Sequence, residues 1–230
     1  MLDRLVALAL ATSALSAPQP PPPAGLPLPA PRGPLVFDAG AKEISLDTLL
    51  RTFAQLTGQE LAMGMQDLQI LQQAREPLES TEPVPAEEIY TFVEGLISRH
   101  GVLIAPISGG SRPILGVYTG AGRGAALPNP EPLLVSLEQL SELERHPALL
   151  VRLIFPFQNT DARQVQTQLR QVTVDPLNMT QIVPVGELSL LMQGRAKEIA
   201  GLVRLLQQAD EHAGRTRLPS APKPEGEGAK

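Results

Sequence analysis

The stretch Val151-Arg152-Leu153-Ile154-Phe155-Pro156-Phe157 decides the fold of this chain. Every second side chain in it, beginning with Val151, is large and apolar, which is typical of a strand with one buried face. A polar segment follows, in which Thr160 or Asp161 is placed to cap the start of a helix. That helix is predicted by apolar residues at helical spacing, namely Val165, Leu169 and Val172.

The residues that follow predict a hairpin and a second helix. Residues 181–185 and 188–193 lie on either side of Gly186-Glu187, which favours two antiparallel strands joined by a tight turn. The last helix is predicted by an apolar stripe that consists of Ile199, Leu202, Val203 and Leu206. Residues 151–211 are therefore expected to form a small βαββα domain.

A looser version of the same pattern, a strand that leads into a helix with one apolar face, occupies residues 35–119. Its strand is expected at 34–38, and its helix is capped by Ser45 and ended by Gly58. The further elements expected here are a strand at 60–63, a short helix at 65–74, a helix that Pro85 opens and His100-Gly101 ends, and a hairpin of 102–107 and 113–118. The fold class is α+β: two small sheet-plus-helix domains in tandem, the first with two helices on one sheet.

Composition narrows the class of protein. The chain has 19 Lys and Arg against 24 Asp and Glu, a net charge of -5, so it lacks the basic excess of a nucleic-acid binder. Its hydrophobic content of 43% is enough for two cores, whereas 24 prolines and 19 glycines indicate that part of the chain is linker. Because it has no Cys, it has no disulfide and no thiolate metal site.

The N-terminal residues predict export. Residues 1–16 combine a short charged start, an apolar run over Leu5–Ala11 and small residues at Ala14 and Ser16, which is the pattern of a signal peptide cleaved after Ser16. The apolar run is too short to span a bilayer. The alternative, an apolar first helix of a cytosolic protein, is disfavoured because the run leads straight into prolines. Residues 17–34 form a Pro-rich linker, expected to be an extended tether with no buried face.

Two further segments are expected to lie outside the domains. Residues 120–150 are predicted to be a Gly/Pro linker followed by a connecting helix over 133–145. Residues 212–230 contain several prolines and charges and little to bury, so a disordered tail is predicted.

The sequence offers little chemistry, and no catalytic, cofactor-binding or metal-binding residue is predicted. Gly120-Ala121-Gly122-Arg123-Gly124 follows a strand, but its third glycine is misplaced for a dinucleotide loop and prolines follow where a helix is needed. Glu87 and Glu88 suit the first turn of a helix better than an acid/base pair, because adjacent helical side chains diverge. The three histidines, His100, His146 and His212, are far apart in sequence and are expected at the surface.

The βαββα order also suggests the KH type of RNA-binding domain. Those domains need a Gly-x-x-Gly clamp and basic charge, and residues 151–211 contain neither. Their arginines are scattered among acidic residues, which suits a surface that contacts proteins.

At this point the residues resemble a known family, the periplasmic N-domains of secretins, which are the ring-forming outer-membrane channels of type II secretion and type IV pilus systems. The resemblance lies in these segments: Val36–Asp38, Ile44–Leu50, Leu56–Gly58, Val84–Tyr90, Leu96, His100–Val102, and above all Val151–Phe157, Asn159–Ala162, Leu169-Arg170, Ile182–Pro184 and Leu188–Gly194. It covers roughly residues 35–210, and its second half is the more specific.

The resemblance implies a non-enzymatic periplasmic component of a protein secretion system. A secretin continues into a glycine-rich region that builds the membrane barrel, whereas this sequence ends in a charged, proline-rich segment, so stand-alone N-domains are expected. They would form or join a periplasmic ring and contact a separate barrel-forming secretin or inner-membrane secretion components, with no nucleic acid and no cofactor. Three alternatives stay open: an accessory of a type IV pilus secretin, an exported enzyme with an interdomain cleft, and an envelope adaptor.

Overall fold

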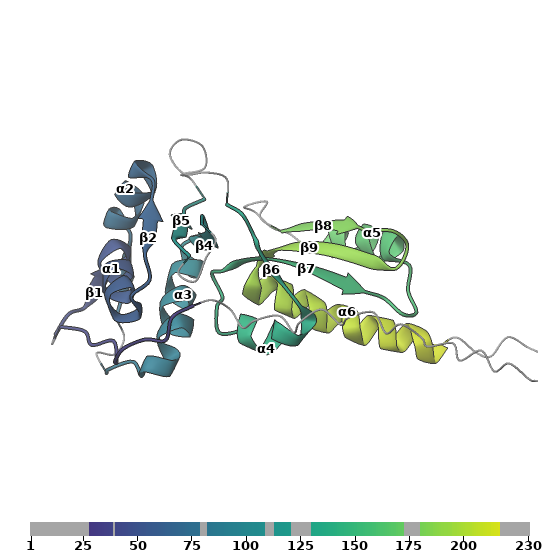
Figure 1. Ribbon diagram of the computed structural model, residues 1–230, viewed down its shortest axis with the longest axis horizontal. Helices are drawn as coiled ribbons and strands as arrows, with labels where there is room; N and C mark the ends of the chain where they lie inside the picture. Colours follow the sequence, from purple (N-terminus) through teal and green to yellow (C-terminus); the bar gives the residue numbers. More distant parts are fainter. Residues whose placement is uncertain are drawn as a thin grey trace, which may run out of the picture.

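The computed structural model describes residues 28–38, 40–78, 82–108, 113–120, 130–172 and 180–216, without the side chains of 170–172 and 216. They form two sheet-and-helix halves that lie side by side, with a long helix running along the second half (Figure 1). The predictions for the signal peptide, for most of the Pro-rich linker, for 121–124 and for the segment after 216 fall outside these residues.

The first half has three helices and two small sheets. Its elements are β1 (Glu43–Ser45), α1 (Leu46–Thr57), β2 (Leu61–Met63), α2 (Met65–Gln73), β3 (Arg75–Pro77), the 3-10 turn η1 (Ala86–Glu88), α3 (Ile89–Arg99), β4 (Leu103–Pro106) and β5 (Leu115–Tyr118). β1 pairs with β3, and the second sheet has the order β2-β5-β4, in which only β2 and β5 are parallel.

Local signals in the first half are confirmed. Ser45 Oγ accepts a hydrogen bond of 3.1 Å from the amide of Thr48, and Gly58 ends α1 with a positive φ of 69°. The hairpin of β4 and β5 and both main helices are where the sequence predicts them. Two expectations are wrong: Leu35 forms only an isolated bridge with Val84, and the strand pair β1-β3 makes a second sheet. The three-residue strands β1 and β3 are too short to show an alternation of apolar and polar side chains in the sequence.

The second half contains the predicted βαββα unit. Its elements are β6 (Leu133–Val135), the 3-10 turn η2 (Leu137–Gln139), α4 (Leu140–Leu143), β7 (Leu150–Pro156), α5 (Ala162–Val172), β8 (Gln181–Pro184), β9 (Ser189–Arg195) and α6 (Ala196–Thr216). The sheet order is β6-β7-β9-β8, with β6 parallel to β7 and the other pairs antiparallel. Asp161 caps α5, because its Oδ1 accepts hydrogen bonds from the amides of Arg163 and Gln164.

Three sequence predictions are wrong at the ends of this half. The connecting helix expected over 133–145 begins only after Ser136, because residues 133–135 pair with β7 as an edge strand. Residues 130–150 therefore belong to the second half and are not a linker. At the C-terminal side, α6 continues through 212–216, where the tail was expected to begin.

Residues 28–34, the end of the predicted Pro-rich tether, lie against the first half. The prediction that the tether has no buried face is therefore wrong for these residues. The amide of Arg32 donates to the carbonyl of Leu56 at 2.8 Å, and Tyr90 Oη donates to the carbonyl of Pro29 at 2.7 Å. Leu28 is partly buried on the core. Polar backbone groups that pair in this way hold an irregular segment in place.

One hydrophobic core runs through both halves. It includes the aromatic residues Phe37, Phe53 and Tyr90, with Phe92 packed at its edge, and it continues into the buried side chains of β7 and β9. The two halves are thus joined by packing as well as by the chain. This continuity fixes how the surfaces of the second half stand relative to the first.

Candidate interaction surface

The sheet of the second half has one covered face and one open face. Val151, Leu153 and Phe155 are buried under α5 and α6 together with their partners on β9. The side chains between them point the other way, where Ile154 is 49% exposed. Strand alternation therefore turns the opposite face of this sheet toward solvent.

The open face carries a row of apolar side chains. Ile154 on β7 is paired with Leu191 on β9, and Leu191 is paired with Val183 on β8, so the three stand side by side across the strands. Val183 is 47% exposed, and Leu134 on the neighbouring β6 is 70% exposed. We call the face formed by Leu134, Arg152, Ile154, Leu191, Gln193 and Val183 the open face.

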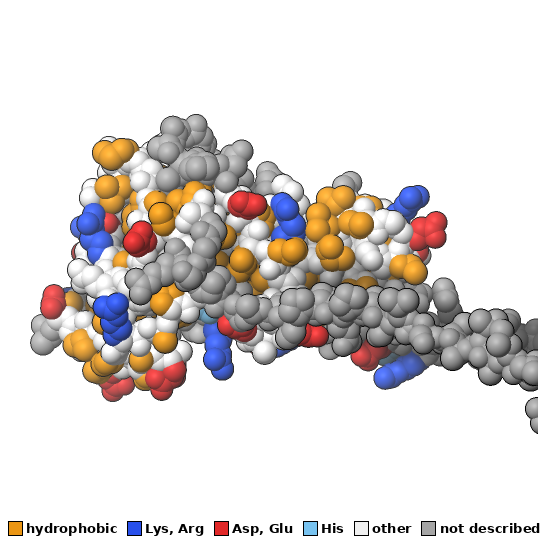
Figure 2. Space-filling view, in the orientation of Figure 1, with side chains coloured by type: hydrophobic (Ala, Val, Ile, Leu, Met, Phe, Trp, Pro, Cys, Tyr) orange, Lys and Arg blue, Asp and Glu red, His pale blue; other side chains and the backbone are white. Residues whose placement is uncertain are grey.

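Exposed apolar residues concentrate at this surface. Among the described residues eight large hydrophobic side chains are exposed; three are on the open face, and two more, Val185 and Leu188, are in the hairpin loop beside it. Figure 2 shows hydrophobic side chains gathered over the strands of this half. Such clustering marks contact surfaces, whereas scattered single residues do not.

Arg152 gives the open face its charge. Its guanidinium donates to Gln193 Oε1 at 2.8 and 3.2 Å, and within the described parts of the chain no carboxylate lies within ion-pair distance of it. The strand residues described on this face include no acidic side chain. The open face is therefore apolar with a positive charge beside the row.

A buried carboxylate joins the two halves just before the start of β7. Glu94 on α3 is 2% exposed, and its two oxygens accept hydrogen bonds from His146 Nδ1 at 2.9 Å and from the amide of Ala148 at 3.1 Å. The amide of Ile104 in turn donates to the carbonyl of Ala148. Because a buried charge is costly unless it is paired, this contact holds α3 to the chain before β7.

The histidine expectation is wrong for His146, which is buried at 6% exposure against Glu94 and the ring of Tyr90. His100 is exposed, as expected, and its Nε2 bonds the buried carboxylate of Glu76 at 2.6 Å, with which Arg99 also pairs. Glu94 and Glu76, the carboxylates that these two histidines bind, are distant from them in sequence.

Burial raises the pKa of Tyr90, and the charge of Glu94 is a smaller cause of the same shift. The Tyr90 hydroxyl therefore remains a hydrogen-bond donor.

A second buried carboxylate holds the loop between β7 and α5 in place. Asp210 on α6 accepts hydrogen bonds from the amides of Gln158 and Asn159, both at 2.9 Å, and from Thr160 Oγ1 at 2.8 Å. Burial acts to raise the pKa of this carboxyl, and the hydrogen bonds outweigh burial and hold the pKa below its ordinary value. The loop between β7 and α5 is thereby fixed to α6.

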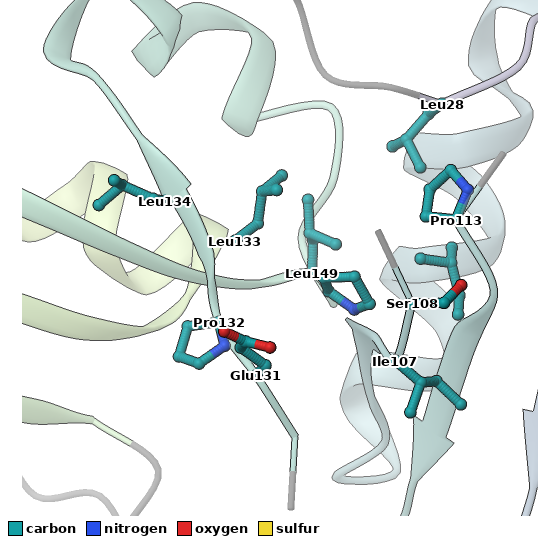
Figure 3. Close-up of a pocket in the computed structure, with 11 residues that line it drawn as sticks. Leu28, Ile107, Ser108, Pro113, Glu131, Pro132, Leu133, Leu134 and Leu149 are labelled. Carbon is teal, nitrogen blue, oxygen red and sulfur yellow. The ribbon is translucent and has the colours of Figure 1, made fainter. Parts of the chain in front are cut away.

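A groove of about 390 Å³ lies between the halves, lined by Leu28, Pro106, Ile107, Ser108, Pro113, Leu115, Glu131, Pro132, Leu133, Leu134 and Leu149. Figure 3 shows Leu133 and Leu149 of the second half facing Pro113 and Leu28 of the first. Glu131 is the one titratable side chain in this lining. The described residues include no cluster of side chains suited to a metal ion, and none of their helices is long and apolar enough to cross a bilayer.

Comparison with known proteins identifies the fold. No protein-family model and no curated protein matches the chain. A solved structure of the Klebsiella pneumoniae type II secretion system outer membrane complex, containing PulD, PulS and the PulC HR domain, matches 75% of this chain with a TM-score of 0.56 and 18% identity. The fold is therefore similar to that of a chain in this secretion system complex. The chain spans 26% of the length of the Klebsiella chain it matches, so the likeness concerns the fold alone.

Two other solved structures align with lower scores. The GspC-GspD complex of enterotoxigenic Escherichia coli covers 76% of this chain and 98% of its own, with 17% identity and a TM-score of 0.28. The N-terminal domain of the secretin XcpQ from Pseudomonas aeruginosa covers 77% and 63%, with 14% identity and a TM-score of 0.25. The expected α+β class is confirmed by the helices and sheets of the structure, and the likeness to a secretion system chain rests on the Klebsiella complex.

Neither the open face nor the Glu94 contact is predicted from the sequence. A signal for the first was present: Ile154 is apolar at a position where alternation expects a polar residue. Glu94 and His146 gave no such signal, since they are 52 residues apart and belong to different predicted segments.

Proposed function

We propose that this protein is a non-enzymatic assembly component of a bacterial protein secretion system, of the type II kind, that acts in the periplasm by contacting other proteins. The observation that carries the proposal is the open face, an apolar sheet surface that neither α5 nor α6 covers. A surface of this kind is costly to leave in water, and it is retained where a protein partner covers it.

The fold supports the same proposal. Its similarity to the chain of the Klebsiella complex favours a role in a secretion assembly, and the apolar groove with a single titratable side chain gives no specific support to an enzyme. In detail, we propose that the protein is exported by residues 1–16. It then forms or joins a ring and contacts an outer-membrane secretin or an inner-membrane secretion component.

The proposal is tested by affinity capture of the full chain from envelope extracts, under conditions that preserve a control secretin complex. We expect a secretin or an inner-membrane secretion component to be recovered. Ile154→Asp should lose that recovery, since it places a charge in the apolar row. Met65→Asp is the matched control, because Met65 on α2 is 70% exposed outside the open face. Recovery of neither class of protein by the unmodified chain would refute the proposal.

A further inference from the structure

We infer that the outer edge of β2 binds an extended segment of a partner protein, which adds to the sheet as a further strand and places apolar side chains in a neighbouring groove. This site lies in the first half of the molecule and does not involve the open face. The inference therefore goes beyond the proposed function and does not depend on it.

The outer edge of β2 carries unpaired backbone groups. In the described part of the chain, β5 is the only strand that pairs with β2. The amide of Leu115 donates to the carbonyl of Glu60 at 2.9 Å. Since successive residues of a strand point their backbone groups to opposite sides, Ala62 faces β5 like Glu60, and Leu61 and Met63 face away from the sheet. No backbone hydrogen bond between described residues pairs these outward groups, so they form a template for another strand.

Other edge strands of the described sheets have features that hinder strand addition. β8 and β4 contain Pro184 and Pro106, Pro132 directly precedes β6, and β1 and β3 contain charged residues. Proline cannot donate to a ladder, and charges disfavour edge pairing. β2 has no proline in or before it and no charge within it, and all three of its residues are partly exposed. Its edge is therefore open to a partner strand.

A groove of about 270 Å³ lies beside this edge, lined by Leu50, Arg51 and Ala54 of α1, Leu61 and Met63 of β2, and Leu68 of α2. In antiparallel pairing, Leu61 and Met63 each exchange two hydrogen bonds with the residue opposite, whose side chain lies on the same face of the sheet as theirs. The two opposing residues would therefore place their side chains in the groove. Because all the lining residues except Arg51 are apolar, these side chains are expected to be apolar.

Arg51 gives the groove its charge. Its guanidinium pairs with Asp47 on the same helix at 2.9 Å, and its side chain is 62% exposed. An exposed pair of this kind is weak, so the guanidinium is able to bind a carboxylate of a partner as well. The expected partner segment therefore alternates apolar residues on one face and carries an acidic residue next to them on that face.

A fluorescein-labelled peptide, Asp-Thr-Val-Thr-Val-Thr-Asp, provides the test when it is titrated with the full chain. In an extended peptide the valines and aspartates share one face, and the valine amides point toward the strand with which they pair. We expect saturable binding. N-methylation of both valines removes the donors to β2 and should weaken binding at least about tenfold. N-methylation of two threonines, whose amides point away, is the control.

Matched variants test the groove. Ala54→Glu places a carboxylate in the groove lining and should weaken binding of the acidic peptide at least about tenfold. Gln55→Glu is the control, because Gln55 is the next residue of α1, exposed and outside the lining. Arg51→Gln should weaken binding several-fold for this peptide and leave binding of the same peptide with Asn at both ends unchanged.

Amide hydrogen exchange locates the bound peptide. With saturating peptide, the amides of Leu61 and Met63 should exchange more slowly, whereas the amide of Ala62 should change little. Absence of saturable binding, equal weakening by the two glutamate variants, or protection confined to other strands would overturn the inference. Self-association of the unmodified chain that Ala54→Glu abolishes would assign the edge to a second copy and overturn it too. Since none of these variants alters the open face, the capture tested with Ile154→Asp is independent of these results.

Discussion

Glu94→Ala should loosen the packing of the first half of the molecule against the second. The side chain is 2% exposed and accepts hydrogen bonds from His146 Nδ1 and from the amide of Ala148. Its removal leaves both donors buried without an acceptor, at a cost of about 1–3 kcal/mol for each. The sum agrees with the roughly 3–5 kcal/mol lost when one partner of a buried pair is removed. Glu94→Gln keeps an acceptor oxygen and should lose less.

Two measurements separate release of the junction from general destabilisation. Urea unfolding gives the loss of stability, and spin labels on Gln66→Cys in α2 and Gln208→Cys in α6, both exposed, give the distribution of distances between the halves. We expect a narrow distribution for the parent protein and a broad one for Glu94→Ala, recorded where both are folded.

The matched control is Glu76→Ala, which also removes a buried carboxylate bonded to a histidine. Glu76 is 5% exposed and pairs with Arg99 and His100, entirely inside the first half. It should cost comparable stability and leave the distance distribution narrow. If Glu94→Ala gives the same narrow distribution as Glu76→Ala, then Glu94 does not hold the halves together and the argument from its buried contacts is wrong.

Three further variants test other contacts. Asp210→Asn should destabilise the protein at pH 7. Because the pKa of Asp210 is lowered in the folded protein, the stability that this carboxylate contributes is complete above its unfolded pKa of about 3.9 and is lost as the pH falls through its folded pKa. The free energies of unfolding in urea at pH 7 and at pH 3 should therefore differ less for the variant than for the parent protein. Ser45→Ala removes the cap of α1 and should cost about 1 kcal/mol, read from the urea midpoint. Gly116→Ala would place a Cβ 2.5 Å from the ring of Tyr118, so the ring must shift. We expect the free energy of unfolding to fall by about 1–3 kcal/mol and the near-ultraviolet circular dichroism of tyrosine to change. An unchanged tyrosine signal would contradict this prediction.

The elements that the sequence predicts well are those encoded by neighbouring residues. Ser45 and Gly58 bound α1 because capping depends on side chains and backbone angles within one turn. The alternation over Val151–Phe157 likewise contains the strand and its buried face. By contrast, β6 is three apolar residues without a period, and only their pairing with residues 151–153 makes them a strand. Local pattern cannot supply that partner.

The candidate surface could be predicted only in part, for the same reason. Ile154 and Val183 stand out in sequence as apolar residues on the polar side of a strand, but their alignment through Leu191 depends on the register of three strands. The partner of Arg152, Gln193, is fixed by that register too. Sequence spacing thus suggests an exposed apolar residue, and topology is needed to turn several of them into one surface.

The open face and the junction depend on one another. Leu150 has the same orientation as Ile154 on β7, yet it is buried against Leu103, Ala105 and Tyr118 of the first half. The first half therefore covers the inner end of this face and leaves only its outer part exposed. Since Glu94 and the shared core hold the first half in that position, a partner seated on the exposed part would also set the direction in which the first half points. If the junction between the halves were loose, a partner could still bind the open face, but the first half would no longer point in one direction. Glu94→Ala should therefore impair an ordered assembly more than it impairs the binding of one partner to the open face.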